Sequence, residues 1–110
     1  MLLQSSQAFT ALQTIDDVLV NNVLASNFSR RYVVSYGLVA SATGLFLDLK
    51  VGLNFVAVNM RPSIINRFPI FPDDYLGQFG VVPGDRIILT GRETISGTPT
   101  LFFGFRFRPV

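Results

Sequence analysis

The fold is decided by the stretch from Tyr32 to Leu53, which reads YVVSYGLVASATGLFLDLKVGL. Even positions are apolar in its first half, residues 32–40, and odd positions are apolar in its second half, residues 45–53. A period of two in apolar residues is typical of β-strands that bury one face. The stretch therefore predicts two strands, separated by the residues from Ser41 to Gly44.

The change of parity at this loop predicts how the two strands pair. If Ala40 pairs with Leu45, the apolar residues of both strands share one face, and the other face carries Ser35, Asp48 and Lys50. Glycine at the end of the loop accepts a positive φ at little cost. The pattern predicts a β-hairpin with a four-residue loop.

The end of the chain shows a second pattern of this kind. Residues 82–85 read Val-Pro-Gly-Asp, a turn signature, and lead into an alternating segment at 86–93. A tip at 94–100 precedes the aromatic-rich residues 101–108. Pairing Glu93 with Leu101 predicts a second hairpin with one apolar face and one face that carries four arginines: Arg86, Arg92, Arg106 and Arg108.

Three other segments are less regular. Residues 54–60 continue the strand that begins at 45 and are apolar on both faces, which predicts a strand buried on both sides or bent between two sheets. Residues 12–28 combine helical spacing with the strand-like run at 18–20, and we favour the strand interpretation. Residues 1–11 are small and polar, and we interpret them as a flexible N-terminal arm.

These elements together predict the fold class. Two long hairpins, each with one apolar face, and proline-rich connections indicate an all-β fold, either an antiparallel β-sandwich or a jelly-roll-like barrel. A chain of 110 residues holds one core. We therefore expect a single β-sandwich domain at 12–110, preceded by the arm at 1–11.

The composition indicates that part of the surface is covered by a partner. Hydrophobic residues make up 49% of the chain, charged residues make up 15%, and the mean hydropathy is +0.44. A core of this size cannot hold so many apolar side chains, so we expect an apolar surface patch. The cations are arginines apart from Lys50, a bias that favours interfaces over solvated surfaces. Both features suggest an oligomer or a component of a larger assembly.

The sequence lacks the residues that several function classes need. It has no cysteine and no histidine, which removes thiolate sites, the commonest general base and the usual zinc ligand. It has no phosphate-binding loop, dinucleotide fingerprint or nucleophile elbow. It also has no run of about 18 apolar residues that would suggest a transmembrane helix. We expect a protein that is not an enzyme, needs no cofactor and has no membrane partner.

The first candidate site is the long segment at 66–80, which carries four aromatic residues: Phe68, Phe71, Tyr75 and Phe79. Long ordered loops are often functional. The aromatic rings can anchor a neighbouring subunit, line a small-ligand pocket, or cap an open end of the sandwich. The sequence alone leaves these three interpretations open.

The second candidate is the pair of acidic dipeptides, Asp16-Asp17 and Asp73-Asp74. Adjacent carboxylates can bind calcium or act as an acid and base pair. However, neighbours in a strand point to opposite faces, and neither pair lies in a recognisable calcium loop. We therefore expect neither a metal site nor catalysis there.

The third candidate is the arginine face of the second predicted hairpin. The predicted register places Arg86 opposite Arg108, and facing like charges destabilise a sheet. Compensation is expected from Asp85 or Glu93, from a neighbouring subunit, or from a phosphate backbone. Nucleic acid is a less favoured partner, because a single-strand binder would carry more basic residues, interleaved with exposed aromatic rings.

A resemblance appears at the end of the chain. The run from Val82 to Leu89, a glycine-containing tip, and an aromatic-rich strand ending Phe107-Arg108-Pro109-Val110 resemble small jelly-roll virion proteins, including bacteriophage decoration (cement) and minor capsid proteins. The resemblance covers roughly residues 81–110. It implies a location in the virion, a trimer or larger ring at a subunit junction, and an N-terminal arm that reaches over a neighbour.

The sequence therefore suggests a non-catalytic structural protein that self-associates and packs into a virion, as a decoration or minor capsid protein. Its expected partners are itself and a major capsid or other virion protein. The expected interface residues are Phe68, Phe71, Tyr75, Phe79, Arg86, Arg92, Arg106 and Arg108. The main alternative is a monomeric β-sandwich that binds carbohydrate or peptide, and a single-strand nucleic-acid binder is the third possibility.

Overall fold

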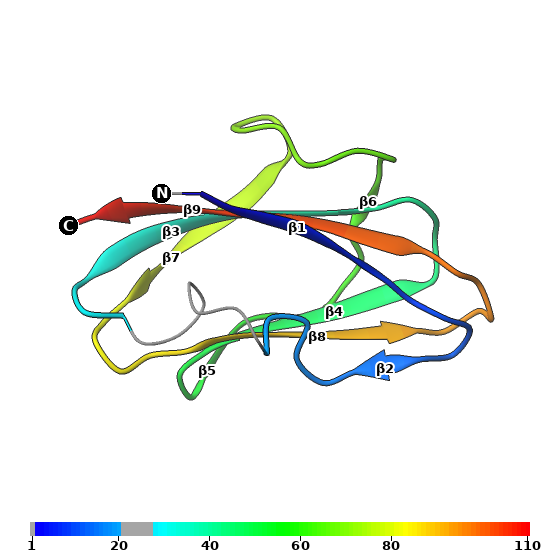
Figure 1. Cartoon of the computed structure of the whole chain (residues 1–110), viewed down its shortest axis with the longest axis horizontal. Helices are drawn as coiled ribbons and strands as arrows, with labels where there is room; N and C mark the ends of the chain where they lie inside the picture. Colours follow the sequence, from blue (N-terminus) through cyan, green and yellow to red (C-terminus); the bar gives the residue numbers. More distant parts are fainter. Residues whose placement is uncertain (1, 21–27) are drawn as a thin grey trace.

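The computed structural model describes residues 2–20 and 28–110, and this part of the chain is all-β (Figure 1). Its strands are β1 (Leu2–Ala8), β2 (Thr14–Ile15), β3 (Tyr32–Ala40), β4 (Leu45–Val51), β5 (Asn54–Met60), β6 (Ser63–Ile64), β7 (Tyr75–Val81), β8 (Ile87–Glu93) and β9 (Thr100–Pro109). They form two sheets packed face to face, so the predicted all-β sandwich is confirmed. No helix long and apolar enough to cross a bilayer occurs among these residues.

The strand order is that of a jelly roll. Sheet A has the order β1-β9-β3, with β7 and the short β6 both pairing with β3, and sheet B has the order β2-β8-β4-β5. The antiparallel pairs β1–β9, β2–β8, β3–β7 and β4–β5 join the two halves of the chain as one long hairpin that folds over itself. These four pairs contain every described strand except the short β6, and the winding of eight strands in this way into two packed sheets is the jelly-roll arrangement.

Both hairpins predicted from the sequence are wrong. β3 lies in sheet A and β4 in sheet B, and likewise β9 lies in sheet A and β8 in sheet B. Ala40 pairs with Leu101, and Leu45 pairs with Glu93. The apolar alternation correctly identified the inward side chains, but it carries no information on which strand lies alongside. Two segments that face the same core from opposite sheets show the same pattern as a hairpin.

The two crossing connections lie side by side and bond to each other. The Thr94 N–H donates to the Gly44 carbonyl at 2.9 Å, and the Ser41 N–H donates to the Thr100 carbonyl at 3.0 Å. Gly44 has a φ of 99°, as its position in the loop suggested. The segments from 41 to 44 and from 94 to 99 therefore close one end of the sandwich together (Figure 1).

The prediction for residues 54–60 is also wrong. The chain reverses at Gly52-Leu53, where Gly52 has a φ of 58°, as expected for a two-residue hairpin with glycine at the first central position. The returning strand β5 is an edge of sheet B, and all seven of its residues are exposed or half-buried. The apolar side chains of this segment, which suggested burial on both faces, instead lie largely at the surface.

The N-terminal region is part of the sandwich. Within the segment expected as an arm, β1 pairs with β9 from Leu2 opposite Arg106 to Ala8 opposite Thr100, and Phe9 is buried in the core. Within residues 12–28, only Thr14–Ile15 form a described strand, and residues 21–27 lie outside the described residues.

The core lies between the sheets and consists of alternate strand residues. Their buried side chains include Val34, Leu38, Leu47, Leu49, Ile87, Leu89, Leu101 and Phe105. Gly91 of β8 leaves room for the ring of Phe9, because a Cβ at Gly91 would lie 2.4 Å from the Phe9 Cζ atom. Native-like packing of this kind fixes the sheets against each other and presents two outer faces to solvent.

Candidate protein-interaction surfaces

The loop between β6 and β7 folds over the outer face of sheet A (Figure 1). Gly37 and Gly104 are cross-strand partners on this face. A Cβ at Gly37 would lie 2.9 Å from the Pro69 Cβ, and a Cβ at Gly104 would lie 2.5 Å from the Tyr75 hydroxyl oxygen. The two glycines thus form a slot that seats the loop on the flat of the sheet, and not over an open end of the sandwich.

Three of the four predicted aromatic residues gather on this outer face. Phe68 packs edge-on against Phe102 with ring centroids 5.2 Å apart, and Phe71 packs edge-on against Tyr75 at 5.1 Å. Phe68 and Phe71 remain 40% and 45% exposed, which leaves them available for a partner. Burial raises the pKa of Tyr75, and the nearby Arg106 opposes this effect.

The fourth aromatic residue, Phe79, points to the other side of β7. Its ring lies 5.8 Å from the ring of the buried Tyr36, and it packs against the core. The strand alternation from Tyr75 to Phe79 would place both on one side, but the register between β3 and β7 shifts at Tyr36/Gly37. A bulge of this kind changes the side to which following residues point.

Asp74 holds the loop in shape. Its carboxylate forms an ion pair with Arg67 and accepts a hydrogen bond from the Ile70 N–H at 2.8 Å. These two bonds lower the pKa of Asp74. Its neighbour Asp73 is exposed. Asp74 therefore has a structural role, and across residues 2–20 and 28–110 no metal-ligating side chains gather in a group of three or more.

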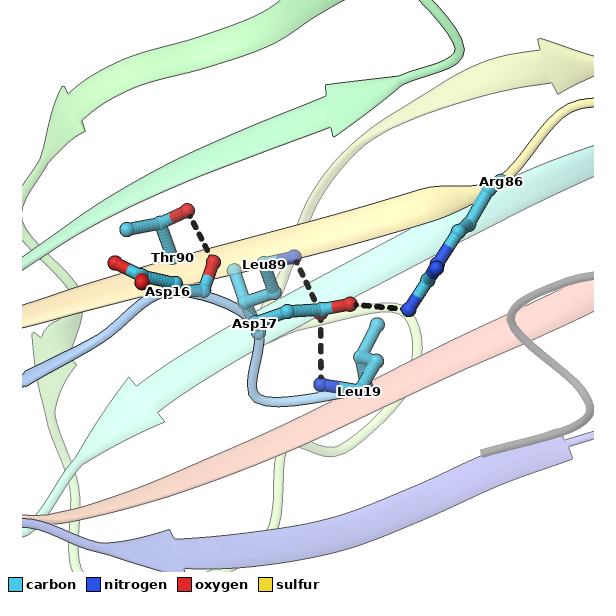
Figure 2. A network of polar contacts seen from close by, with 6 residues as sticks. All are labelled: Asp16, Asp17, Leu19, Arg86, Leu89 and Thr90. Carbon is cyan, nitrogen blue, oxygen red and sulfur yellow. Dashed lines mark hydrogen bonds and ion pairs between the residues drawn. The ribbon is translucent and has the colours of Figure 1, made fainter. Parts of the chain in front are cut away.

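Arg86 is held on sheet B by Asp17, which Figure 2 shows between its partners. The Arg86 guanidinium donates to Asp17 at 2.9 Å, and the same carboxylate accepts from the Leu19 N–H at 3.0 Å. Beside it, the Thr90 hydroxyl donates to the Asp16 carbonyl at 2.7 Å. The predicted pair of Arg86 with Arg108 is wrong, since β8 and β9 lie in different sheets.

Arg92 belongs to a second network on sheet B. It donates to Asp48 at 2.7 Å and to the side-chain oxygen of Asn59, while the Asn59 N–H donates to Asp48 at 2.8 Å. The hydrogen bond from Arg92, followed by that from Asn59, lowers the pKa of Asp48. Asn59 has a φ of 52°, at an irregular part of β5. The network therefore ties β4, β8 and the end of β5 together.

Glu93 is the buried charged residue of the described chain, with 3% of its surface exposed. Its carboxylate accepts from the Leu12 N–H at 2.7 Å and the Ile95 N–H at 2.9 Å. The hydrogen bond from Leu12 is the main cause of its lowered pKa, and burial opposes it. Glu93 joins the segment before β2 to the connection after β8, so it is a structural carboxylate.

Arg106 and Arg108 lie on the outer face of sheet A, apart from Arg86 and Arg92. Arg106 pairs with Leu2 of β1 on one side and with Ser35 of β3 on the other. A groove of about 580 Å³ runs over this row, lined by Leu2, Ser35, Phe71, Gln78, Arg106, Phe107, Arg108 and Pro109. The Arg106 guanidinium lies 4.2 Å from the centroid of the Phe71 ring. The structure thus brings Phe71, Arg106 and Arg108 together.

The β5 edge is a surface that the sequence interpretation missed. Leu53 is 91% exposed, Phe55 is 60% exposed and Val58 is 59% exposed. No charged residue occurs between Lys50 and Arg61. We call Leu53, Phe55 and Val58 the β5 edge patch. Gly52 followed by Asn54 is the turn signal that would have identified β5 as a returning strand.

Comparisons with models of protein families, with characterised proteins and with solved structures gave no match. The surfaces that bear on function are therefore the β5 edge patch on sheet B and the arginine groove on sheet A.

Proposed function

We propose that this protein is a non-catalytic structural subunit that self-associates and packs into a larger assembly, of which a viral shell is the leading case. The observation that carries the proposal is the β5 edge. Edge strands present unpaired backbone N–H and C=O groups, and proteins normally protect them with charged residues, proline or very short strands. The edge of β5 has none of these between Leu53 and Val58.

The other edges of the two sheets differ from β5 in this respect. β2 and β6 are two residues long, and β1 is rich in serine and glutamine. β7 is likewise a long edge without charge or proline, but it carries two glycines and the irregularity opposite Tyr36 and Gly37. The register of β5 on β4 shifts at two places, between Phe55 and Ala57 and between Ala57 and Met60, but neither irregularity places a charge or a proline on the edge. Pairing with β5 of a second copy would satisfy the backbone groups and cover the β5 edge patch at the same time.

The topology supports an assembly in a virion, because jelly rolls form the subunits of many viral capsids. Lectins and cupins share this architecture, so the fold by itself does not choose among them. The resemblance of residues 81–110 to decoration and minor capsid proteins favours the virion role.

The proposal is tested at Val58. A lysine there introduces a charge into the edge that self-association would bury, so Val58→Lys is expected to reduce the native mass measured by light scattering to that of the monomer. Leu12→Lys is the matched control, because Leu12 is also exposed, at 63%, but lies just before β2, at the opposite edge of sheet B from β5. Equal masses for the two variants would contradict the role of β5.

A monomeric module that binds peptide or carbohydrate is the second candidate function. The groove beside Phe71 favours it, since an aromatic ring with nearby polar groups is suited to either ligand. This alternative predicts a monomer at every protein concentration and a mass that Val58→Lys leaves unchanged.

A further inference from the structure

The arginine pair of the sheet A groove is electrostatically unbalanced. Arg106 and Arg108 are both exposed and occupy successive positions on one face of β9, about 7 Å apart along the strand. Three other arginines are neutralised within the fold, in the pairs Arg67–Asp74, Arg86–Asp17 and Arg92–Asp48. Among residues 2–20 and 28–110, no carboxylate lies within ion-pair distance of Arg106 or Arg108.

Arg106 is also held in place. Its guanidinium lies over the face of Phe71, the Phe71 ring packs on Tyr75, and Tyr75 occupies the space above Gly104. A cation held on an aromatic face loses little conformational entropy when a ligand binds. The position of this cation is therefore set by the loop before any partner arrives.

The surroundings of the pair favour an anion. The groove is lined by neutral and basic residues, with Ser35 and Gln78 as hydrogen-bonding groups beside Arg106. Ser35 pairs with both Arg106 and Gln78, so the three side chains form a row across β9, β3 and β7. None of the described residues that line the groove is acidic, so none would repel a carboxylate.

We propose that this groove binds an extended acidic segment of a partner protein, with alternate carboxylates of the segment on Arg106 and Arg108. An extended chain presents every second side chain to one face with the same period of about 7 Å. The inference deepens the proposed function and rests on it, since it states the chemistry of a partner in the assembly. Nucleic acid is disfavoured because Arg106 covers the Phe71 face on which a base would stack.

The experiment measures binding of a fluorescent peptide with aspartate at alternate positions, using anisotropy at low ionic strength. The same peptide with asparagine at those positions is expected not to bind. The double variant Arg106→Gln/Arg108→Gln should weaken binding of the acidic peptide at least about tenfold. Arg61→Gln is the matched control, because Arg61 is also exposed and also lies over a ring, that of Phe46, at 5.0 Å.

A second variant keeps the test independent of any effect on the loop. Gln78→Glu adds a negative charge to the groove from β7 and should also weaken binding, with circular dichroism confirming that the variant is folded. Failure of the native protein to bind the acidic peptide, equal binding by the double variant, or tighter binding of an oligothymidylate than of the peptide would each overturn the proposal.

The result is separable from that for self-association. The groove lies on sheet A and the β5 edge patch on sheet B. Val58→Lys is therefore expected to bind the acidic peptide as the native protein does. A native protein that is monomeric but binds the peptide would reject self-association alone, and an oligomer that does not bind the peptide would reject the groove alone.

Discussion

Gly37 of β3 and Gly104 of β9 face each other on the outer side of sheet A, and the ring of Tyr75 fills the space that their missing side chains leave. A Cβ at Gly37 would lie 2.8 Å from the Tyr75 Cδ1 atom. This pair of glycines is the reason that the loop before β7 lies flat on the sheet. It also sets the position of Phe71 and, through that ring, of Arg106.

Gly104→Ala should therefore destabilise the protein by about 1–3 kcal/mol, because the added methyl group displaces a packed ring. The measurement is the free energy of unfolding from urea titration. Gly80→Ala is the control: Gly80 has no atom within 4 Å of an added Cβ, so we expect a change within about 0.5 kcal/mol. Equal effects of the two substitutions would show that the slot does not hold the loop.

Asp48→Asn should destabilise the protein by about 1 kcal/mol at neutral pH. It removes the charge that accepts from Arg92 and from the Asn59 N–H, and both side chains of the ion pair are partly screened by solvent. Urea unfolding at pH 7 measures the difference. Asp73→Asn, at an exposed carboxylate, is the matched control and should change the stability little.

The contribution of Asp48 should depend on pH in a defined direction. The folded protein lowers the pKa of this carboxyl below its usual value of 3.8, so its contribution is complete above that value and is lost as the pH falls through the folded pKa. The native protein should lose more stability than Asp48→Asn between neutral pH and pH values below 3.8. Parallel losses in the two proteins would contradict a stabilising role for the ionised carboxylate.

Strand pairing can be tested by disulfide formation, because the chain has no cysteine of its own. Lys50 pairs with Ile88 across β4 and β8, at a separation that a disulfide spans. Oxidised Lys50→Cys/Ile88→Cys should therefore form an intramolecular crosslink, detected as a shift on non-reducing electrophoresis.

The control for this crosslink uses the pairing that the sequence predicted. A local hairpin would place Ser35 opposite Lys50, whereas the structure puts them in different sheets, on β3 and β4. Ser35→Cys/Lys50→Cys should not crosslink. A crosslink in that variant, or none between positions 50 and 88, would contradict the jelly-roll topology.

The sequence predicted the fold class and the inward residues but not the topology. Period-two alternation depends on which side of a strand faces the core, and it identified Leu47, Leu49, Phe103 and Phe105 as core residues. The partner of a strand depends instead on contacts between distant segments, such as Ala40 with Leu101. Local patterns carry no record of those contacts, and loops that join sheets resemble hairpin loops.

The candidate site was predicted only in part, because its residues too are brought together by contacts between distant segments. Phe71, Arg106 and Arg108 do share one surface, but Arg86 and Arg92 lie on the other sheet, and Phe79 packs against the core. The sequence could not show that Asp17 neutralises Arg86 or that Asp48 neutralises Arg92. The partners are separated by 69 and by 44 positions in the chain, and they meet only because of the jelly-roll topology.

Self-association through β5 is tested most directly by the native mass of the unaltered chain, measured by light scattering over a wide range of concentration. Self-association predicts a mass that is a multiple of the 12.2 kDa monomer and that decreases on dilution. A mass of 12.2 kDa at every concentration would contradict it and leave the exposed edge of β5 without the proposed role.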